Sequence, residues 1–223
     1  MSNKLLNEYL TTTNNIKNVL KSNGPLHKET FYVSLFYRDL FNRVFNNLDN
    51  NDDIIDLMKP PCKNEDKIVS HIFRMVYISF SWVLITNELL SCISSIIGTN
   101  NVLSVCSGKG VLESLLNSKY KCNIIKTDLI GYKDVEEIDA IEAIIKYQPN
   151  ILFVSWLPYD NQIGLKIVET FKGDTIVMIG EINGYNGTKE MFKYLNINFI
   201  SSEYDVVETW CDVSDTLIVY KRK

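Results

Sequence analysis

The sequence predicts an α/β fold in which a mostly parallel sheet follows a helical amino-terminal region. From residue 101 onward, short apolar runs that suit strands alternate with segments of helical periodicity, and this alternation favours parallel strands joined by right-handed crossovers. Before residue 98, apolar side chains recur at steps of three and four residues, which is typical of amphipathic helices. We therefore expect a helical extension over residues 1–98 and a sheet domain of about seven strands over residues 99–223.

The amino-terminal region is expected to hold helices over residues 3–21, 28–48, 65–80 and 87–97. The second of these carries an aromatic stripe that includes Phe41, which predicts a face buried in the core. Residues 49–63 are polar and contain two adjacent prolines, so they predict a connecting loop. Thr86 is placed to cap the last helix. Two interpretations of Trp82 remain open: it fills the core at a helix kink, or it lies in a loop that leads to a ligand pocket.

The stretch 101–113 predicts a strand, a tight turn and a helix, and the rest of the sheet domain is organised around it. Residues 102–106 suit a strand that is buried on both faces, while Gly108 and Gly110 allow a sharp turn. Without Cβ atoms the backbone can approach a bound nucleoside closely, and the free N–H groups at the helix start favour a carboxylate or a phosphate. A turn that merely packs tightly is the alternative.

The remaining elements follow in alternation to the end of the chain. Strands are expected over 122–127, 150–155, 175–180, 197–202 and 216–220, with helices over 139–147, 163–171 and 189–195.

Composition narrows the class of protein. A net charge of −4 argues against a generally basic surface that would bind nucleic acid, and it leaves only a local groove open. Five scattered cysteines without a Cys-x-x-Cys pair and two isolated histidines predict no disulfide framework and no metal site. The apolar stretch 75–98 contains Asn87 and Glu88 near its middle, which argues against a membrane span. With no secretory signal, we expect a reducing, cytoplasmic location.

Two groups of side chains are candidates for chemistry at the carboxyl ends of the predicted strands. Asp128 ends the second strand, where a carboxylate can accept hydrogen bonds from both hydroxyls of a ribose; an ordinary surface aspartate is the alternative. Residues 155–160 follow the strand over 150–155, so Trp156 and Tyr159 beside Pro158 would form an aromatic wall; a proline turn with a buried tryptophan is the alternative. Glu181 ends the next strand on the same rim.

These residues together resemble the class I S-adenosylmethionine-dependent methyltransferases. Residues 102–110 are similar to that family's first motif, with Ser104 in place of its acid and Cys106 in place of its first glycine. Asp128 matches the family's ribose-binding acid, and 155–159 resembles its fourth motif, although Leu157 replaces one proline. More narrowly, Phe80-Ser81-Trp82, Ser155-Trp156-Leu157-Pro158-Tyr159 and Ile179-Gly180-Glu181 look like the motifs of a poorly characterised subgroup.

The resemblance implies a Rossmann-like, seven-stranded, mostly parallel sheet with a reversed last strand. It implies S-adenosylmethionine as the cofactor and methyl transfer to an unidentified acceptor held near Trp156 and Tyr159. The cofactor-binding residues would be Trp82, Cys106, Ser107, Gly108, Gly110, Asp128, Leu129 and Ser155. The catalytic residues would be Ser155, Trp156, Tyr159 and Asp160, with Pro158 and Glu181 at the substrate.

Two other functions remain open. A non-catalytic, methyltransferase-like binding or regulatory module would keep the fold, and the changes at Ser104, Cys106 and Leu157 motivate it. A dehydrogenase would need a third glycine near Glu113, where the sequence has none.

Overall fold

The computed structural model describes residues 11, 37–39, 41–42, 67–182, 184–210 and 213–223. It divides into two compact units, Met1–Phe80 and Ser81–Lys223. The division lies before the boundary expected after residue 98, so the helix over 87–97 belongs to the second unit. The helix expected over 3–21, most of the one over 28–48 and the loop over 49–63 lie outside the described residues.

The described part of the first unit contains an aromatic core. Residues 37–39 and 41–42 are helical, and α4 spans Lys67–Tyr77. The rings of Tyr37, Phe41, Phe73 and Tyr77 are fully buried, with centroids 5.1 to 5.8 Å apart. The expectation that Phe41 lies in a buried face is therefore confirmed.

The second unit begins with a loop and then α5, which spans Asn87–Ile97. The Thr86 hydroxyl accepts a hydrogen bond from Leu89 N at 3.1 Å, so it satisfies one of the free donors at the helix start. Residues 81–86 are not helical, and Trp82 is 49% exposed. The interpretation of this segment as a helix kink with Trp82 in the core is wrong, because the Thr86 cap starts a new helix after the loop.

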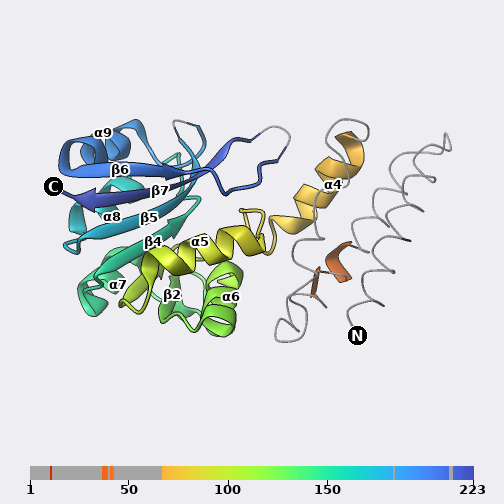
Figure 1. Ribbon diagram of the computed structural model, residues 1–223, viewed down its shortest axis with the longest axis horizontal. Coiled ribbons are helices and arrows are strands. Elements are labelled where there is room, and N and C mark those ends of the chain that lie inside the picture. Colours follow the sequence, from red (N-terminus) through yellow and green to blue (C-terminus); the bar gives the residue numbers. More distant parts are fainter. Residues whose placement is uncertain (1–10, 12–36, 40, 43–66, 183, 211–212) are drawn as a thin grey trace. The chain divides into compact units, whose positions relative to one another are not determined.

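The sheet has seven strands in the order β3-β2-β1-β4-β5-β7-β6 (Figure 1). The strands are β1 Val102–Val105, β2 Ile124–Asp128, β3 Glu136–Glu137, β4 Ile151–Ser155, β5 Thr175–Glu181, β6 Phe199–Tyr204 and β7 Asp215–Arg222. Strands β1 to β5 run parallel, and β7 runs antiparallel to both β5 and β6. The predicted Rossmann-like sheet with a reversed last strand is confirmed.

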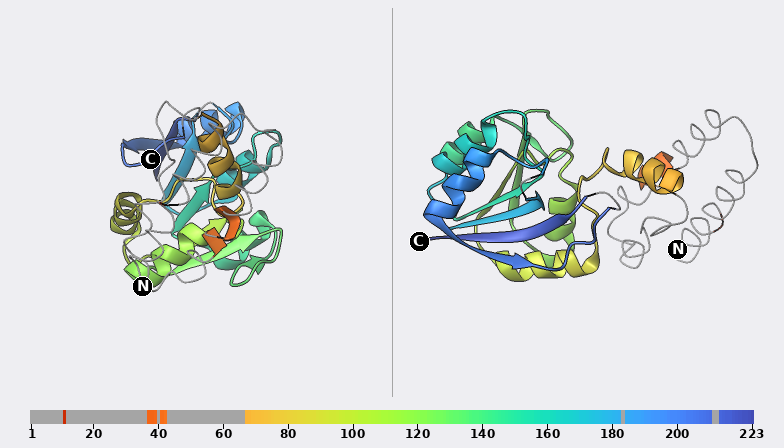
Figure 2. Two further views of the ribbon diagram at one scale, coloured as in Figure 1. Left: turned by 90° about the vertical axis from the view of Figure 1, so that its right-hand side faces the viewer. Right: turned by 90° about the horizontal axis from the view of Figure 1, so that it is seen from above.

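Helices cover both faces of the sheet. The crossover helices are α6 Val111–Tyr120, α7 Ala140–Tyr147, α8 Ile163–Thr170 and α9 Lys189–Asn198. Helices α8 and α9 lie on one face and α5 on the other (Figure 2). Residues 151–154 are buried because β4 is central and covered on both sides, as its continuous apolar run predicts. In the described residues, no helix is long and apolar enough to cross a membrane.

Candidate functional site

The turn between β1 and α6 has the geometry that its glycines predict. Gly108 and Gly110 both have left-handed backbones, with φ of 55° and 61°. A Cβ atom on Gly110 would lie 2.8 Å from the Lys126 side chain, so this end of the turn is packed. A Cβ atom on Gly108 would meet nothing within 4 Å, so the space above this residue is open. The turn is therefore tight at one end and accessible at the other, where a ligand could approach the backbone.

Asp128 fastens this turn to the end of β2. Its Oδ2 accepts a hydrogen bond from Gly108 N at 2.8 Å, and its Oδ1 accepts one from Ile130 N at 3.0 Å. Beside it, Ser107 N and Ser107 Oγ both donate to Thr127 O at 3.1 Å. Each carboxylate oxygen has a second lone pair, so Asp128 can still accept from a ribose while it holds the turn. Leu129 follows with 70% of its surface exposed.

Cys106 has a left-handed backbone with φ of 55°, at the position where the resembled motif has glycine. Burial raises the pKa of its thiol to about 12, and the nearby carboxylates of Asp128 and Asp139 add to the effect. The side chain is therefore a neutral thiol at physiological pH and not a nucleophile. Because Cys106 follows the end of β1, its neutral side chain could contact a ligand by packing against it.

Two substitutions of Cys106 separate the free-energy cost of its left-handed backbone conformation from the role of its thiol. Cys106→Ala keeps the Cβ atom in the left-handed region, whereas Cys106→Gly removes it. We expect the glycine variant to be more stable than the alanine variant by about 1 kcal/mol, because an L side chain disfavours this conformation. Urea unfolding of the two variants measures the difference, and equal stability would mean that the turn relaxes around the Cβ atom.

A buried pair lies beneath the turn. Ser104 Oγ donates to Glu113 Oε1 at 2.6 Å, and both residues are almost completely buried. Burial raises the pKa of Glu113 and the charge of Asp128 adds to this, while the hydrogen bond from Ser104 and the charge of Lys126 oppose it. Ser104, which stands where the resembled motif has an acid, thus contacts an acid of α6. Sequence reasoning missed Glu113, and its only signal is an acid within the apolar stripe that includes Leu112 and Leu116.

The raised pKa of Glu113 predicts a pH-dependent stability. The folded state binds this proton more tightly than the unfolded chain, so the stabilisation is present below the ordinary pKa of 4.5 and is lost as the pH rises through the folded value. Glu113→Gln cannot ionise. It should unfold at a higher urea concentration than the native protein at about pH 8, and the two midpoints should converge below about pH 4.

The exposed Glu169→Gln is the control, and it should show no such pH-dependent gap. If Glu113→Gln is less stable than the native protein at high pH, the glutamate is held as an anion by Lys126.

Trp156 follows β4 directly and is held in a left-handed conformation. Its φ is 54°, which is unusual for a bulky residue, and its backbone N–H donates to Ile179 O at 2.9 Å. Its ring stacks on Trp82, with centroids 5.5 Å apart and planes 28° from parallel. Within the described part of the chain, the buried Trp156 Nε1 has no hydrogen-bond partner. Strain and an unpaired donor at a strand end are features that functional sites retain.

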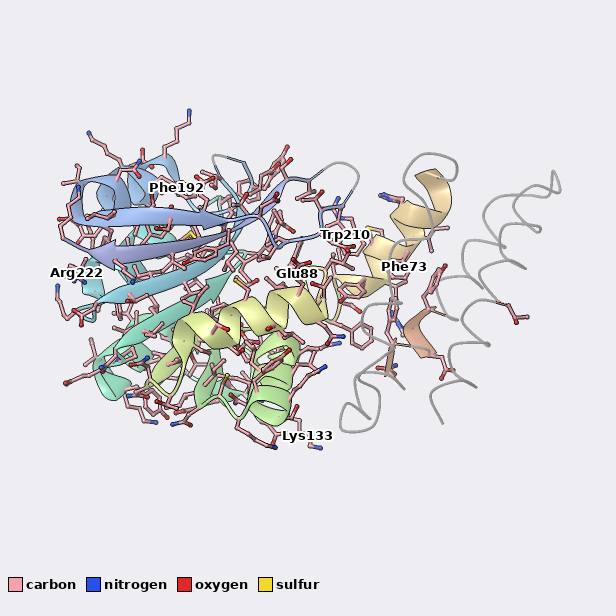
Figure 3. The ribbon with its side chains drawn as sticks, in the orientation of Figure 1. Phe73, Glu88, Lys133, Phe192, Trp210 and Arg222 are labelled. Carbon is pink, nitrogen blue, oxygen red and sulfur yellow. The ribbon has the colours of Figure 1, made fainter. Side chains whose placement is uncertain are left out.

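Trp82 is fixed from a third loop. Trp210 lies on the connection between β6 and β7 (Figure 3). Its Nε1 donates to the Trp82 carbonyl oxygen at 3.3 Å. Trp82 therefore lies in a loop and stacks on Trp156. That this loop leads to a ligand pocket stays a prediction. Sequence reasoning missed Trp210, because a hydrogen bond across 128 positions leaves no local pattern.

The loops after β4 and β5 are joined by a buried amide. Asn186 is 1% exposed, and its Oδ1 accepts a hydrogen bond from Leu157 N at 2.7 Å. Gly187 N donates to Leu157 O at 3.1 Å, which closes the link from the other side. A Cβ atom on Gly180 would lie 2.5 Å from the Asn186 side chain, so the glycine makes room for this amide. Sequence reasoning missed Asn186 because a buried loop asparagine has the same local sequence as an exposed one.

A second aromatic pair lies on these joined loops. Tyr159 and Tyr185 are 53% and 63% exposed, and their rings meet edge to face with centroids 5.1 Å apart. Glu181 Oε2 accepts a hydrogen bond from Tyr185 N at 3.3 Å. Asp160 and Pro158 are exposed next to Tyr159, and Ser155 is half-buried at the end of β4. Trp156 and Tyr159, which were expected to form one wall, each pair with a different ring.

Among the described residues, neither a metal-ligand group nor the groove at the amino ends of β4 and β5 gives an alternative site for the predicted site residues. No group of three or more histidine, cysteine or acidic side chains in the described residues could hold a metal ion. A groove of about 880 Å³ is lined by residues that include Gln148, Asn150 and Asp174, at the amino ends of β4 and β5. This groove lies at the opposite ends of the strands from the glycine turn, and none of the predicted site residues lines it.

Comparison with known proteins gives only distant likenesses. No protein-family model and no curated protein sequence matches the chain. Among solved structures, the chain is similar to human N-acetylserotonin methyltransferase in complex with SAM, at 11% identity and a TM-score of 0.43. That match covers 68% of this chain and 55% of the human protein.

Two further solved structures are similar at the same level. EvdMO1 matches at 13% identity with a TM-score of 0.40, over 60% of this chain and 40% of that protein. A mutant of MtNAS in complex with S-adenosylmethionine matches at 10% identity with a TM-score of 0.45, over 93% of this chain and 83% of that protein. The chain spans about half the length of the first two proteins. Likenesses this distant assign neither a family nor a reaction.

Proposed function

We propose that this chain is an S-adenosylmethionine-dependent methyltransferase. The observation that carries the proposal is the glycine turn fastened by Asp128 at the carboxyl ends of β1 and β2. In open α/β sheets, ligands bind outside the carboxyl ends of the strands, and an acid at the end of the second strand suits a ribose. The reversed β7, next to β5, supports the same fold type as the resembled methyltransferases.

The residues at this edge fit the parts of the proposed cofactor. The open space above Gly108 allows a nucleoside close to the backbone, and the Asp128 carboxylate has lone pairs left for ribose hydroxyls. The exposed side chain of Leu129 offers an apolar surface to an adenine ring. The turn itself contains Cys106, Ser107 and Gly110. In the proposal, the cofactor also contacts Trp82 and Ser155.

When it is bound, S-adenosylmethionine supplies a methyl group that its sulfonium already activates. The work of the chain is then to position the acceptor and to exclude water, so catalysis arises mainly from proximity and orientation. In the proposal, the acceptor lies near Trp156 and Tyr159, which the links through Asn186 and Trp82 hold in place. Asp160 and Glu181 are the carboxylates on these loops that can accept a proton.

Calorimetry on the full chain tests the proposal. S-adenosylmethionine and its demethylated product, S-adenosylhomocysteine, should both bind with one site per chain. Absence of heat with both ligands, in a protein that unfolds cooperatively, would refute it.

A non-catalytic module with the same fold is the second candidate, and one observation favours it. Both Asp128 oxygens already accept hydrogen bonds from Gly108 N and Ile130 N, so the carboxylate has a structural role without any ligand. In that case neither nucleoside would raise the melting temperature of the protein. A ligand that binds only the folded state must raise it.

A further inference from the structure

We propose that the methyl acceptor is an amine that arrives as a cation, recognised by the Tyr159–Tyr185 pair together with the Glu181 carboxylate. This inference rests on the proposed methyltransferase function and names the chemical class of its acceptor.

The first step is the exposure of the tyrosine pair. Tyr159 and Tyr185 each leave more than half of their surface open to solvent, although their rings contact each other edge to face. Large aromatic side chains are usually more deeply buried than this, and two of them together form an exposed apolar patch. The faces that the edge-to-face contact leaves open carry the negative part of the ring quadrupole, which attracts cations.

The second step is the rigidity of the pair. Tyr159 lies two residues after Leu157. The N–H and the carbonyl oxygen of Leu157 are hydrogen-bonded to Asn186 and Gly187, respectively. Tyr185 lies directly before Asn186, and its backbone N–H is held by Glu181. The backbone of Tyr185 is therefore held directly, and Tyr159 follows two residues after a held backbone, which limits the conformational entropy lost when a ligand binds.

The third step is charge. Residues 155–162 and 181–188 contain Asp160 and Glu181 and no lysine, arginine or histidine. Within the described part of the chain, neither carboxylate forms an ion pair. An anionic acceptor would be repelled here, and a neutral apolar acceptor would desolvate the carboxylates without compensation. A cationic amine satisfies both the aromatic faces and the carboxylates.

The same features suit the transfer itself. The cationic amine first releases its proton, through a carboxylate of this site to water, because its free lone pair is the nucleophile. That lone pair then forms a bond to the methyl carbon while the carbon–sulfur bond breaks and its electrons go to sulfur. Positive charge thus moves from sulfur to nitrogen, and a site with aromatic faces and a carboxylate stabilises the charge where it develops.

The test uses choline as the probe, in the presence of saturating S-adenosylhomocysteine, with binding followed by ligand-observed NMR on the full chain. The matched probe is the neutral isostere of choline, in which a tert-butyl group replaces the trimethylammonium group. We expect choline to bind about tenfold more tightly than the isostere, as a desolvated cation–π contact allows. Equal affinities, or no binding of choline, would overturn the proposal.

Three variants locate the site. Tyr185→Leu and Glu181→Gln should each weaken choline binding by about fivefold, whereas Tyr185→Phe should keep it because the ring is retained. An unchanged affinity in Tyr185→Leu would overturn the proposal. Choline that binds only when S-adenosylhomocysteine is absent would do so as well, because the cation site would then belong to the sulfonium of the donor. Failure of S-adenosylhomocysteine to bind at all refutes the methyltransferase function separately, and the same titration records it.

Discussion

Asp128→Ala should lower the affinity for S-adenosylmethionine by about ten- to a hundredfold. The change removes the acceptor for Gly108 N and Ile130 N and, in the proposed complex, the acceptor for the ribose hydroxyls. A hydrogen bond to a charged group contributes about 1.5–3 kcal/mol, which corresponds to this range of affinity. Calorimetric titration of the variant with S-adenosylmethionine measures the loss.

Two control variants separate the causes of this loss. Asp128→Asn keeps one acceptor oxygen, so its affinity should lie between those of the native protein and the alanine variant. Asp205→Ala removes an exposed carboxylate from the β6–β7 connection and should leave the affinity unchanged. If Asp128→Ala binds as tightly as the native protein, the carboxylate serves only to hold the turn.

Asn186→Ala should lower the free energy of unfolding of the second unit by about 2 kcal/mol. The change leaves Leu157 N buried without an acceptor, and an unpaired buried donor carries a full desolvation cost. It also opens the link between the loops after β4 and β5. Hydrogen exchange, followed by mass spectrometry on peptides that cover 151–162, should show faster exchange of the Leu157 amide.

Asn196→Ala is the matched control, because Asn196 is an exposed asparagine on α9. It should not accelerate exchange in this peptide, and alanine favours the helix. Unchanged exchange in the Asn186 variant would mean that a water molecule replaces the amide oxygen.

Where local physics dictates an element, the sequence predicted it closely. Thr86 and the apolar pattern after it placed α5 at residues 87–97, because a capping hydroxyl and helical periodicity are local signals. The run 151–154 predicted a buried central strand for the same reason. Strand β3 was missed, because a strand of two glutamates has neither an apolar run nor an alternation. Its pairing with β2 depends on partners from elsewhere in the chain.

In the candidate site, too, the residues with local signals were predictable and those that depend on distant partners were not. The glycine turn and the place of Asp128 at the end of the second strand were predictable, since both follow from the ends of adjacent strands. Glu113 and Asn186 were not, because each acts through a partner that only folding brings near. Sequence reasoning also joined Trp156 and Tyr159 in one wall, whereas their rings pair with residues from two other loops. Their roles in binding remain predictions.

The contact of Trp210 with Trp82, and of Trp82 with Trp156, has an optical consequence. These three residues are all the tryptophans of the chain, and they connect the loops at 81–86, after β4 and between β6 and β7. Stacked and hydrogen-bonded indoles differ in emission from separated, hydrated ones. The tryptophan fluorescence of the unlabelled protein therefore arises from the edge where we place the ligand, and it reports the arrangement of three loops in a single signal.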